Sequence, residues 1–105
     1  MKMYKKVQSA KWFTPKQDGD FIEGIVEGVG QHEGNFGKSD YVNILDGNGE
    51  TRVSITAGLS YINFYELEGE RVKIIYGGMV NNPKTKRNYK SFEVLKFETD
   101  RFPIF

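Results

Sequence analysis

The chain has 105 residues, a formal net charge of +1 and no cysteine. This length is that of one domain, and it allows a hydrophobic core but neither disulfides nor a thiolate metal site. No apolar run approaches the roughly 20 residues that a membrane-spanning helix needs, and no apolar segment follows the basic residues 1–6 as a signal peptide would require. We therefore expect a cytoplasmic protein, because a chain without cysteine fits a reducing compartment.

The charges are arranged in blocks along the chain. Residues 1–16 carry five lysines and no acid, residues 17–70 carry eleven acids against two bases, and residues 71–97 carry seven bases against one acid. Such blocks in a small domain predict either two faces of opposite potential or blocks that interleave in space and cancel. The three-dimensional arrangement of the blocks decides between the two.

Five segments have the alternating or β-branched pattern of strands. The predicted strands cover residues 21–29, 41–45, 51–56, 71–76 and 89–97. A helical piece at residues 59–67 separates the third strand from the fourth. Three strands, a helix and two further strands are the order of the five-stranded Greek-key barrel called the OB-fold. We therefore predict an all-β OB-fold domain with one short helix at residues 19–98, a basic lead-in or edge strand at residues 1–18 and a short tail at residues 99–105.

Alternation within the second and third strands predicts which side chains form the core. Gly24 and Gly28 interrupt the first strand and predict a bulge or tight bend, which lets one long strand serve both halves of the sheet. Tyr61, Phe64 and Tyr65 are expected mostly to cap the bottom of the barrel. The predicted core face of the second and third strands consists of Val42, Ile44, Val53 and Ile55.

Two polar loops are predicted beside the sheet, at residues 30–40 and 77–88. His32 has no second ligand-type residue at metal spacing, so we expect a solvated loop residue and no metal site. Trp12 is either a ring on which a base stacks or a plug for an open end of the barrel, and the plug is the preferred interpretation. No cofactor is predicted.

Catalysis has little support, because there is no cysteine, only one histidine, and no paired spacing among the acids. Single-stranded nucleic acid is better supported as a ligand. In the OB-fold, oligonucleotides lie across strands two and three between the loops that follow strands one and four. They need cations for the phosphates and rings for the bases. The candidate binding residues at the places named are Phe36, Lys38, Tyr41, Asn43, Arg52, Ser54, Lys84, Lys86, Arg87, Tyr89 and Lys90. Among them, Phe36, Tyr41 and Tyr89 are expected to stack on bases. One further candidate, Lys73, faces outward from the fourth strand.

Three sequence stretches carry a resemblance to a known family. They are Gly19-Asp20-Phe21-Ile22-Glu23-Gly24, Gly69-Glu70-Arg71-Val72-Lys73-Ile74-Ile75-Tyr76-Gly77-Gly78 and Tyr89-Lys90-Ser91-Phe92-Glu93-Val94. Over roughly residues 19–97 the chain resembles the small bacteriophage-type OB-fold single-stranded DNA-binding proteins. The resemblance implies sequence-independent protection of single-stranded DNA during phage DNA replication or recombination, in the cytoplasm of a host.

The C-terminus has a resemblance of its own. The last residues are similar to the Ile-Pro-Phe ending through which bacterial single-strand binders recruit partners. This similarity implies that replication or recombination proteins dock on the tail, although the long acidic stretch that often precedes such an ending is missing here. The alternative is a tail that packs its aromatic rings on the barrel. The residues concerned are Phe102, Pro103, Ile104 and Phe105.

Two other classes of function remain open. An OB-fold that binds another polypeptide through its strand face is consistent with the acidic stretch at residues 17–70. An RNA-binding protein of the cold-shock type would use the same surface as a DNA binder. It is disfavoured because only Tyr41 supplies a ring on the second and third strands.

Overall fold

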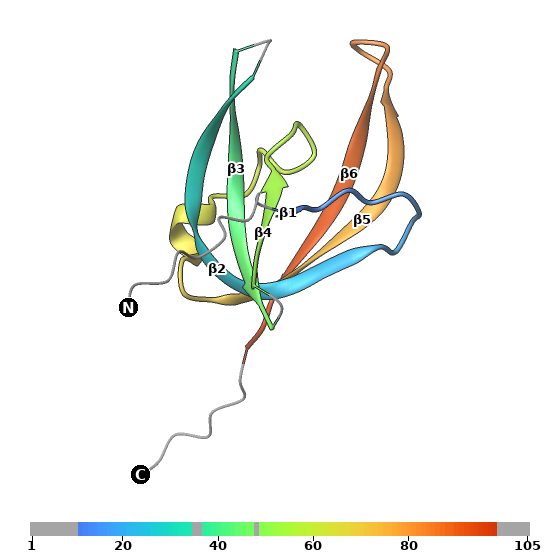
Figure 1. The fold of residues 1–105 in the computed structure, drawn as a ribbon. Helices are drawn as coiled ribbons and strands as arrows, with labels where there is room; N and C mark the ends of the chain where they lie inside the picture. Colours follow the sequence, from blue (N-terminus) through green and yellow to red (C-terminus); the bar gives the residue numbers. More distant parts are fainter. Residues whose placement is uncertain (1–10, 35–36, 48, 99–105) are drawn as a thin grey trace, which may run out of the picture.

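The computed structural model describes residues 11–34, 37–47 and 49–98. These residues are mostly β-structure and form one curled sheet shaped like a half-barrel (Figure 1). The sheet has six strands in the described ranges, hydrogen-bonded in the order β1-β4-β3-β2-β5-β6. The elements are β1 (Lys11–Trp12), β2 (Phe21–Gly34), β3 (Gly37–Asp46), β4 (Gly49–Ser54), the 3-10 helix η1 (Phe64–Leu67), β5 (Arg71–Asn82) and β6 (Arg87–Lys96).

The predicted count of five strands is therefore wrong by one. The additional strand, β1, pairs in parallel with β4, with Trp12 opposite Arg52. It lies within the lead-in where a basic edge strand was expected, and its first residue is Lys11. Residues 13–18 of that predicted segment form no strand, and residues 1–10 lie outside the described residues.

Strand β2 bends and serves both halves of the sheet, as the interrupting glycines predicted. Its first part, up to Ile25, pairs antiparallel with β5, and the part from Ile25 onward pairs antiparallel with β3. The register with β3 shifts between Val26 and Gly28, which places a bulge at the bend.

The core lies on the concave side of the sheet. Val42, Ile44 and Val53 are at most 1% exposed, which confirms the alternation predicted for β3 and β4. Ile55 is only partly buried and packs against this core. The other buried members come from β2, β5 and the segment that connects β4 to β5: Ile22, Val26, Leu59, Phe64, Val72, Ile74 and Tyr76.

The predicted helix at residues 59–67 is reduced to a single 3-10 turn. Asn63 precedes this turn in an extended conformation, and its side chain accepts a hydrogen bond from the Tyr65 amide at 3.2 Å. Asparagine favours such caps over helix interiors, so the turn begins after Asn63. Phe64 is 2% exposed and caps the core as expected. In contrast, Tyr61 and Tyr65 are 65% and 67% exposed, so their assignment to the cap is wrong.

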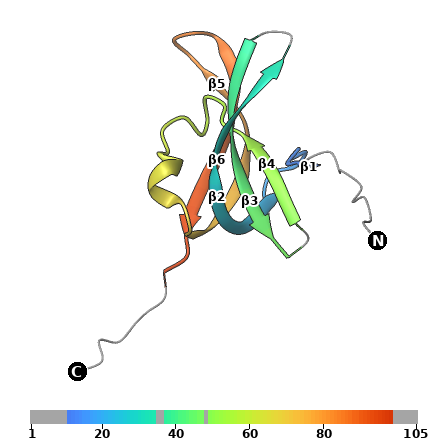
Figure 2. The ribbon, with the colours of Figure 1, turned by 60° about the vertical axis from the view of Figure 1, so that its left-hand side comes forward.

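Both predicted polar loops are instead the outer parts of long hairpins. Strands β2 and β3 stay paired to Gly34 and Gly37, and β5 and β6 stay paired to Asn82 and Arg87. We call the hairpin beyond the pair Gly30–Tyr41 the β2–β3 arm, and the hairpin beyond the pair Met79–Lys90 the β5–β6 arm. In two views of the molecule they project toward the same end, and Figure 1 shows β4 and β1 between them (Figures 1 and 2).

The chain that follows β4 packs against β6. Gly58 is buried, and a Cβ atom at this position would overlap the carbonyl oxygen of Lys90 on β6. The loop main chain therefore packs directly on the β6 main chain, and a larger residue at position 58 would separate them. This contact holds the base of the β5–β6 arm beside the end of β4.

Candidate functional site

Three aromatic rings and one guanidinium group meet on the convex face of the sheet. The ring of Trp12 makes edge-on contacts with His32 and Tyr41, with ring centroids 5.5 and 5.7 Å apart. The Arg52 guanidinium carbon lies 4.4 Å from the centroid of the Tyr41 ring and 5.8 Å from that of Trp12. We refer to Trp12, His32, Tyr41 and Arg52 as the ring cluster.

Strand pairing explains how residues so distant in sequence meet. Tyr41 alternates with the buried Val42, so its ring lies on the opposite, convex face. Trp12 is the register partner of Arg52, and Gly30 is that of Tyr41. A Cβ atom on Gly30 would lie 2.5 Å from the Tyr41 hydroxyl oxygen and 2.6 Å from Cζ, so the absent side chain leaves the space in which the Tyr41 ring lies.

The ring cluster has the chemistry of a stacking surface. Trp12 remains 38% exposed although two other rings contact it. Arginine and aromatic side chains both stack on the flat face of a nucleobase, and arginine also binds phosphate. The cluster thus offers contacts for a base and for the backbone beside it.

Acidic side chains border the ring cluster toward the bulge of β2. Glu27, Gly28, Tyr41 and Asn43 line a shallow pocket of about 130 Å³. A side-chain hydrogen bond with Glu50 raises the pKa of Glu27, and desolvation and the charge of Glu50 act in the same direction. The Asn43 Oδ1 atom nearby is buried and has no hydrogen-bond partner among the described residues. Two neighbouring carboxylates repel phosphate, so this end of the face is unfavourable for a nucleic-acid backbone.

This carboxyl pair predicts a pH-dependent effect on stability. The pKa of Glu27 is higher in the folded protein than in the unfolded chain, so the folded state favours the protonated carboxyl group. Protonated Glu27 therefore stabilises the fold at pH values below 4.5, and this contribution is lost as the pH rises through the pKa of the folded state. Glu27→Gln is therefore expected to raise the melting temperature at pH 7, by roughly a few degrees at most since the pair is solvent-exposed. Calorimetry at pH 7 and pH 4 tests this, and the gain should disappear at pH 4. Glu23→Gln is the control, because Glu23 forms an ion pair with Arg71 and losing this pair should not stabilise the protein. An equal gain in melting temperature for both variants would contradict the repulsion between Glu27 and Glu50.

The two arms differ in charge. The β5–β6 arm, from Met79 to Lys90, contains four cations and no acid. On the β2–β3 arm, Lys38 is the register partner of Glu33, and Asp40 lies close by. The cations of the β5–β6 arm, all exposed, are Lys84, Lys86, Arg87 and Lys90. The charge blocks of the sequence are therefore still separated at the two arms of the folded protein. Of these two arms, only the β5–β6 arm is suited to hold phosphates.

A pocket joins the ring cluster to the cationic arm. It has a volume of about 320 Å³ and lies between Trp12 and Ser54 on one side and Lys90 and Phe92 on the other. We call this space the seam pocket, because it lies where β4 and β6 approach without pairing in the described sheet. Trp12 of the ring cluster and Lys90 of the cationic arm thus line the same pocket. We refer to the arm cations, the seam pocket and the ring cluster together as the candidate surface.

Most of the sequence-predicted site residues fall on this surface, but not all. Tyr41 and Arg52 are in the ring cluster, Asn43 is beside it, Ser54 and Lys90 line the seam pocket, and Lys84, Lys86, Arg87 and Tyr89 are on the β5–β6 arm. Lys38 is on the other arm. Lys73 instead lies 4.2 Å from the ring centroid of Phe21, near the pairing of β2 with β5. Phe36 and the proposed docking residues Phe102, Pro103, Ile104 and Phe105 lie outside the described residues.

Two members of the ring cluster, Trp12 and His32, were not among the predicted binding residues. Trp12 is an exposed member of a surface cluster, so its preferred assignment as a barrel plug is wrong. His32 lies on a strand in contact with Trp12, which corrects its assignment to a loop. For Trp12 the sequence offers only its place in the basic segment of residues 1–16. For His32, alternation continued from Gly28 and Gly30 places it on the same face as Tyr41.

No family model, curated protein or solved structure matches this chain. In the described part of the chain, no helix has the length and apolar character that spanning a membrane requires.

Proposed function

We propose that this protein is an OB-fold binder of single-stranded DNA without sequence preference, acting in phage DNA replication or recombination. The observation that carries the proposal is the ring cluster, which shares Trp12 with a seam pocket whose other wall bears a lysine of the cationic arm. A single strand needs this combination, because its phosphates require cations and its unpaired bases present faces for stacking.

The strand order supports the OB-fold part of the proposal. Strands β2 to β6 follow one another as three strands, a short helical turn and two strands, and the long bent β2 lies between β3 and β5. In this fold, nucleic acid lies across the second and third strands. Here those strands are β3 and β4, which bear Tyr41 and Arg52.

The arm cations supply a test of the proposal. The affinity for oligo(dT) is expected to fall with salt, with log K changing by about 0.7 per phosphate contact per decade. Replacing Lys84, Lys86 and Arg87 together with Ala should lower this slope by up to about 2 and weaken binding equally on all sequences. Fluorescence anisotropy at several salt concentrations measures both quantities.

A control that removes two cations elsewhere on the protein separates local contacts from net charge. Arg71 and Lys96 are cations already paired with Glu23 and Glu70. Replacing these two with Ala should leave the salt slope unchanged. If the arm variant also kept the slope and affinity of the native protein, the phosphate track would not be on this arm.

A second candidate function is a module that binds another protein. Exposed apolar side chains favour it, since Phe21, Leu95 and Phe97 are 54%, 46% and 58% exposed around β2, β5 and the end of β6. Exposed apolar surface is typical of sites that contact other proteins. A protein-interaction module would give no salt-sensitive shift of oligo(dT) in a gel, whereas the proposed DNA binder would.

A further inference from the structure

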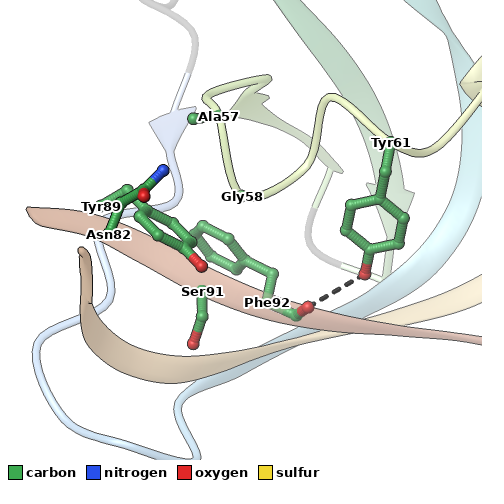
Figure 3. Close-up of a pocket in the computed structure, with 7 residues that line it drawn as sticks. All are labelled: Ala57, Gly58, Tyr61, Asn82, Tyr89, Ser91 and Phe92. Atoms are coloured by element: carbon green, nitrogen blue, oxygen red, sulfur yellow. Dashed lines mark hydrogen bonds between the residues drawn. The ribbon is translucent and has the colours of Figure 1, made fainter. Parts of the chain in front are cut away.

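A second pocket lies along the β5–β6 arm, between Phe92 and Asn82, and shares Phe92 with the seam pocket. It has a volume of about 370 Å³, within the range of pockets that hold small ligands. Tyr61 comes from the loop after β4, Tyr89 and Phe92 come from β6, and Asn82 comes from the end of β5. Figure 3 shows the Tyr89 and Phe92 rings next to each other, with Tyr61 across from them. We call this space the tyrosine pocket.

The walls of the tyrosine pocket are held in place by contacts that do not need a ligand. The Tyr61 hydroxyl donates a hydrogen bond to the carbonyl oxygen of Phe92 at 3.0 Å, so the ring is positioned although it is 65% exposed (Figure 3). Gly58 keeps the loop against β6, because a Cβ atom there would overlap the Lys90 carbonyl oxygen and come within 3.3 Å of the Phe92 ring. A preformed pocket binds at a lower entropic cost than one that must be ordered.

The polar groups of the tyrosine pocket suit a flat heterocycle. The Asn82 Oδ1 atom accepts a hydrogen bond from the Lys84 amide at 3.0 Å, which sets the side-chain amide with its nitrogen as the donor. In Figure 3 this nitrogen extends toward the loop at Ala57. The Ser91 hydroxyl donates to the Gly78 carbonyl oxygen at 3.2 Å and keeps a lone pair as an acceptor. Rings above and below with a few polar groups at the edge are what a nucleobase requires.

The location of the pocket indicates where its ligand comes from. Phe92 lines both the tyrosine pocket and the seam pocket, and the arm cations begin two residues beyond Asn82. A strand that runs from the ring cluster through the seam pocket to the arm therefore passes the mouth of the tyrosine pocket. We infer that the tyrosine pocket receives one nucleobase turned out of the bound single strand, a site separate from the ring cluster. This inference rests on the proposed function.

Oligo(dT) binding by three tyrosine variants tests the inference. Tyr61→Ala is expected to lose about 5- to 150-fold in affinity, the range for one stacked base. Tyr61→Phe keeps the ring but not the hydrogen bond to Phe92 that positions it, and should lose less affinity than Tyr61→Ala. Tyr65→Ala is the matched control, since Tyr65 is 67% exposed and does not line the pocket; its affinity should not change. Circular dichroism and the melting temperature show whether each variant is folded.

Photocrosslinking of the native protein provides a readout that does not depend on variant folding. Oligo(dT) with 5-iododeoxyuridine at one position is irradiated in the complex, and the linked peptides are mapped. Crosslinks at Tyr61 or Tyr89 are expected from one position of the strand, and crosslinks at Trp12 or Tyr41 from another. Crosslinks confined to Trp12 and Tyr41, or native affinity in folded Tyr61→Ala, would overturn the pocket inference and leave the proposed function standing. A native protein that does not bind oligo(dT) would overturn both.

Discussion

Replacing Tyr41 with Ala is expected to weaken oligo(dT) binding by about 1–3 kcal/mol, roughly 5- to 150-fold. The Tyr41 ring lies in the space that Gly30 leaves free, beneath the Arg52 guanidinium at 4.4 Å and against the edge of Trp12. Removing the ring takes away one surface on which a base can stack. It also removes a packing contact of Arg52 and of Trp12. The double variant Trp12→Ala/Tyr41→Ala should bind more weakly still, but with a loss that differs from the sum of the single losses, because the two rings are in contact.

A second pair of ring and cation supplies the control for this experiment. Lys73 lies 4.2 Å from the ring centroid of Phe21, which is 54% exposed. This pair has the same chemistry as Tyr41 with Arg52 but lies apart from the proposed surface. Phe21→Ala should therefore bind oligo(dT) with native affinity, and a loss equal to that of Tyr41→Ala would contradict the placement of the site. A Tyr41→Ala protein that melts early yet binds normally when folded would make Tyr41 a structural residue.

Replacing Phe64 with Ala is expected to lower the free energy of unfolding by about 3–5 kcal/mol, the range for a fully buried phenylalanine. Phe64 is 2% exposed and belongs to the core formed by β2, β3, β4 and β5. The adjacent Tyr65 is 67% exposed, and its replacement with Ala should change the free energy of unfolding by no more than about 0.5 kcal/mol. Urea unfolding of the two variants measures the contrast, and equal losses would mean that the 3-10 turn does not orient these rings as described.

The strand segments whose side chains are buried could be predicted from the sequence. The paired strands of the two arms, whose side chains are mostly exposed, could not. Val42, Ile44 and Val53 alternate with polar residues because one face of their strands is buried. Beyond Gly30 and Met79 the strands continue into the arms, where most residues on both faces are exposed. Without burial there is no alternation, so these segments resemble polar loops although their main chains stay paired.

For the aromatic residues between positions 59 and 67, the prediction of burial failed for a different reason. Helical spacing assigned Tyr61, Phe64 and Tyr65 together to the cap, but only Phe64 is buried. The asparagine cap at position 63 and a 3-10 turn in place of an α-helix change which side chains share a face. The outcome left Tyr61 free to line the tyrosine pocket.

The candidate site was predictable on β3 and β4 but not beyond them. Tyr41 and Arg52 followed from alternation, since their neighbours Val42 and Val53 are core residues. Trp12 did not, because β1 has two residues and pairs with a strand about forty positions away, and so short a strand has no period to read. The link between the ring cluster and the arm, through the seam pocket, exists only in the folded chain.

The emission of Trp12 during a titration with oligo(dT) tests the central claim most directly. Trp12 is the only tryptophan of the chain and belongs to the ring cluster, so its fluorescence reports on that surface alone. If bases stack there, the emission should be quenched and should reach its plateau at the same DNA concentration as the anisotropy of the labelled oligonucleotide. If the anisotropy saturates while the Trp12 emission stays unchanged, the DNA binds elsewhere on the protein, and the account of the ring cluster is wrong.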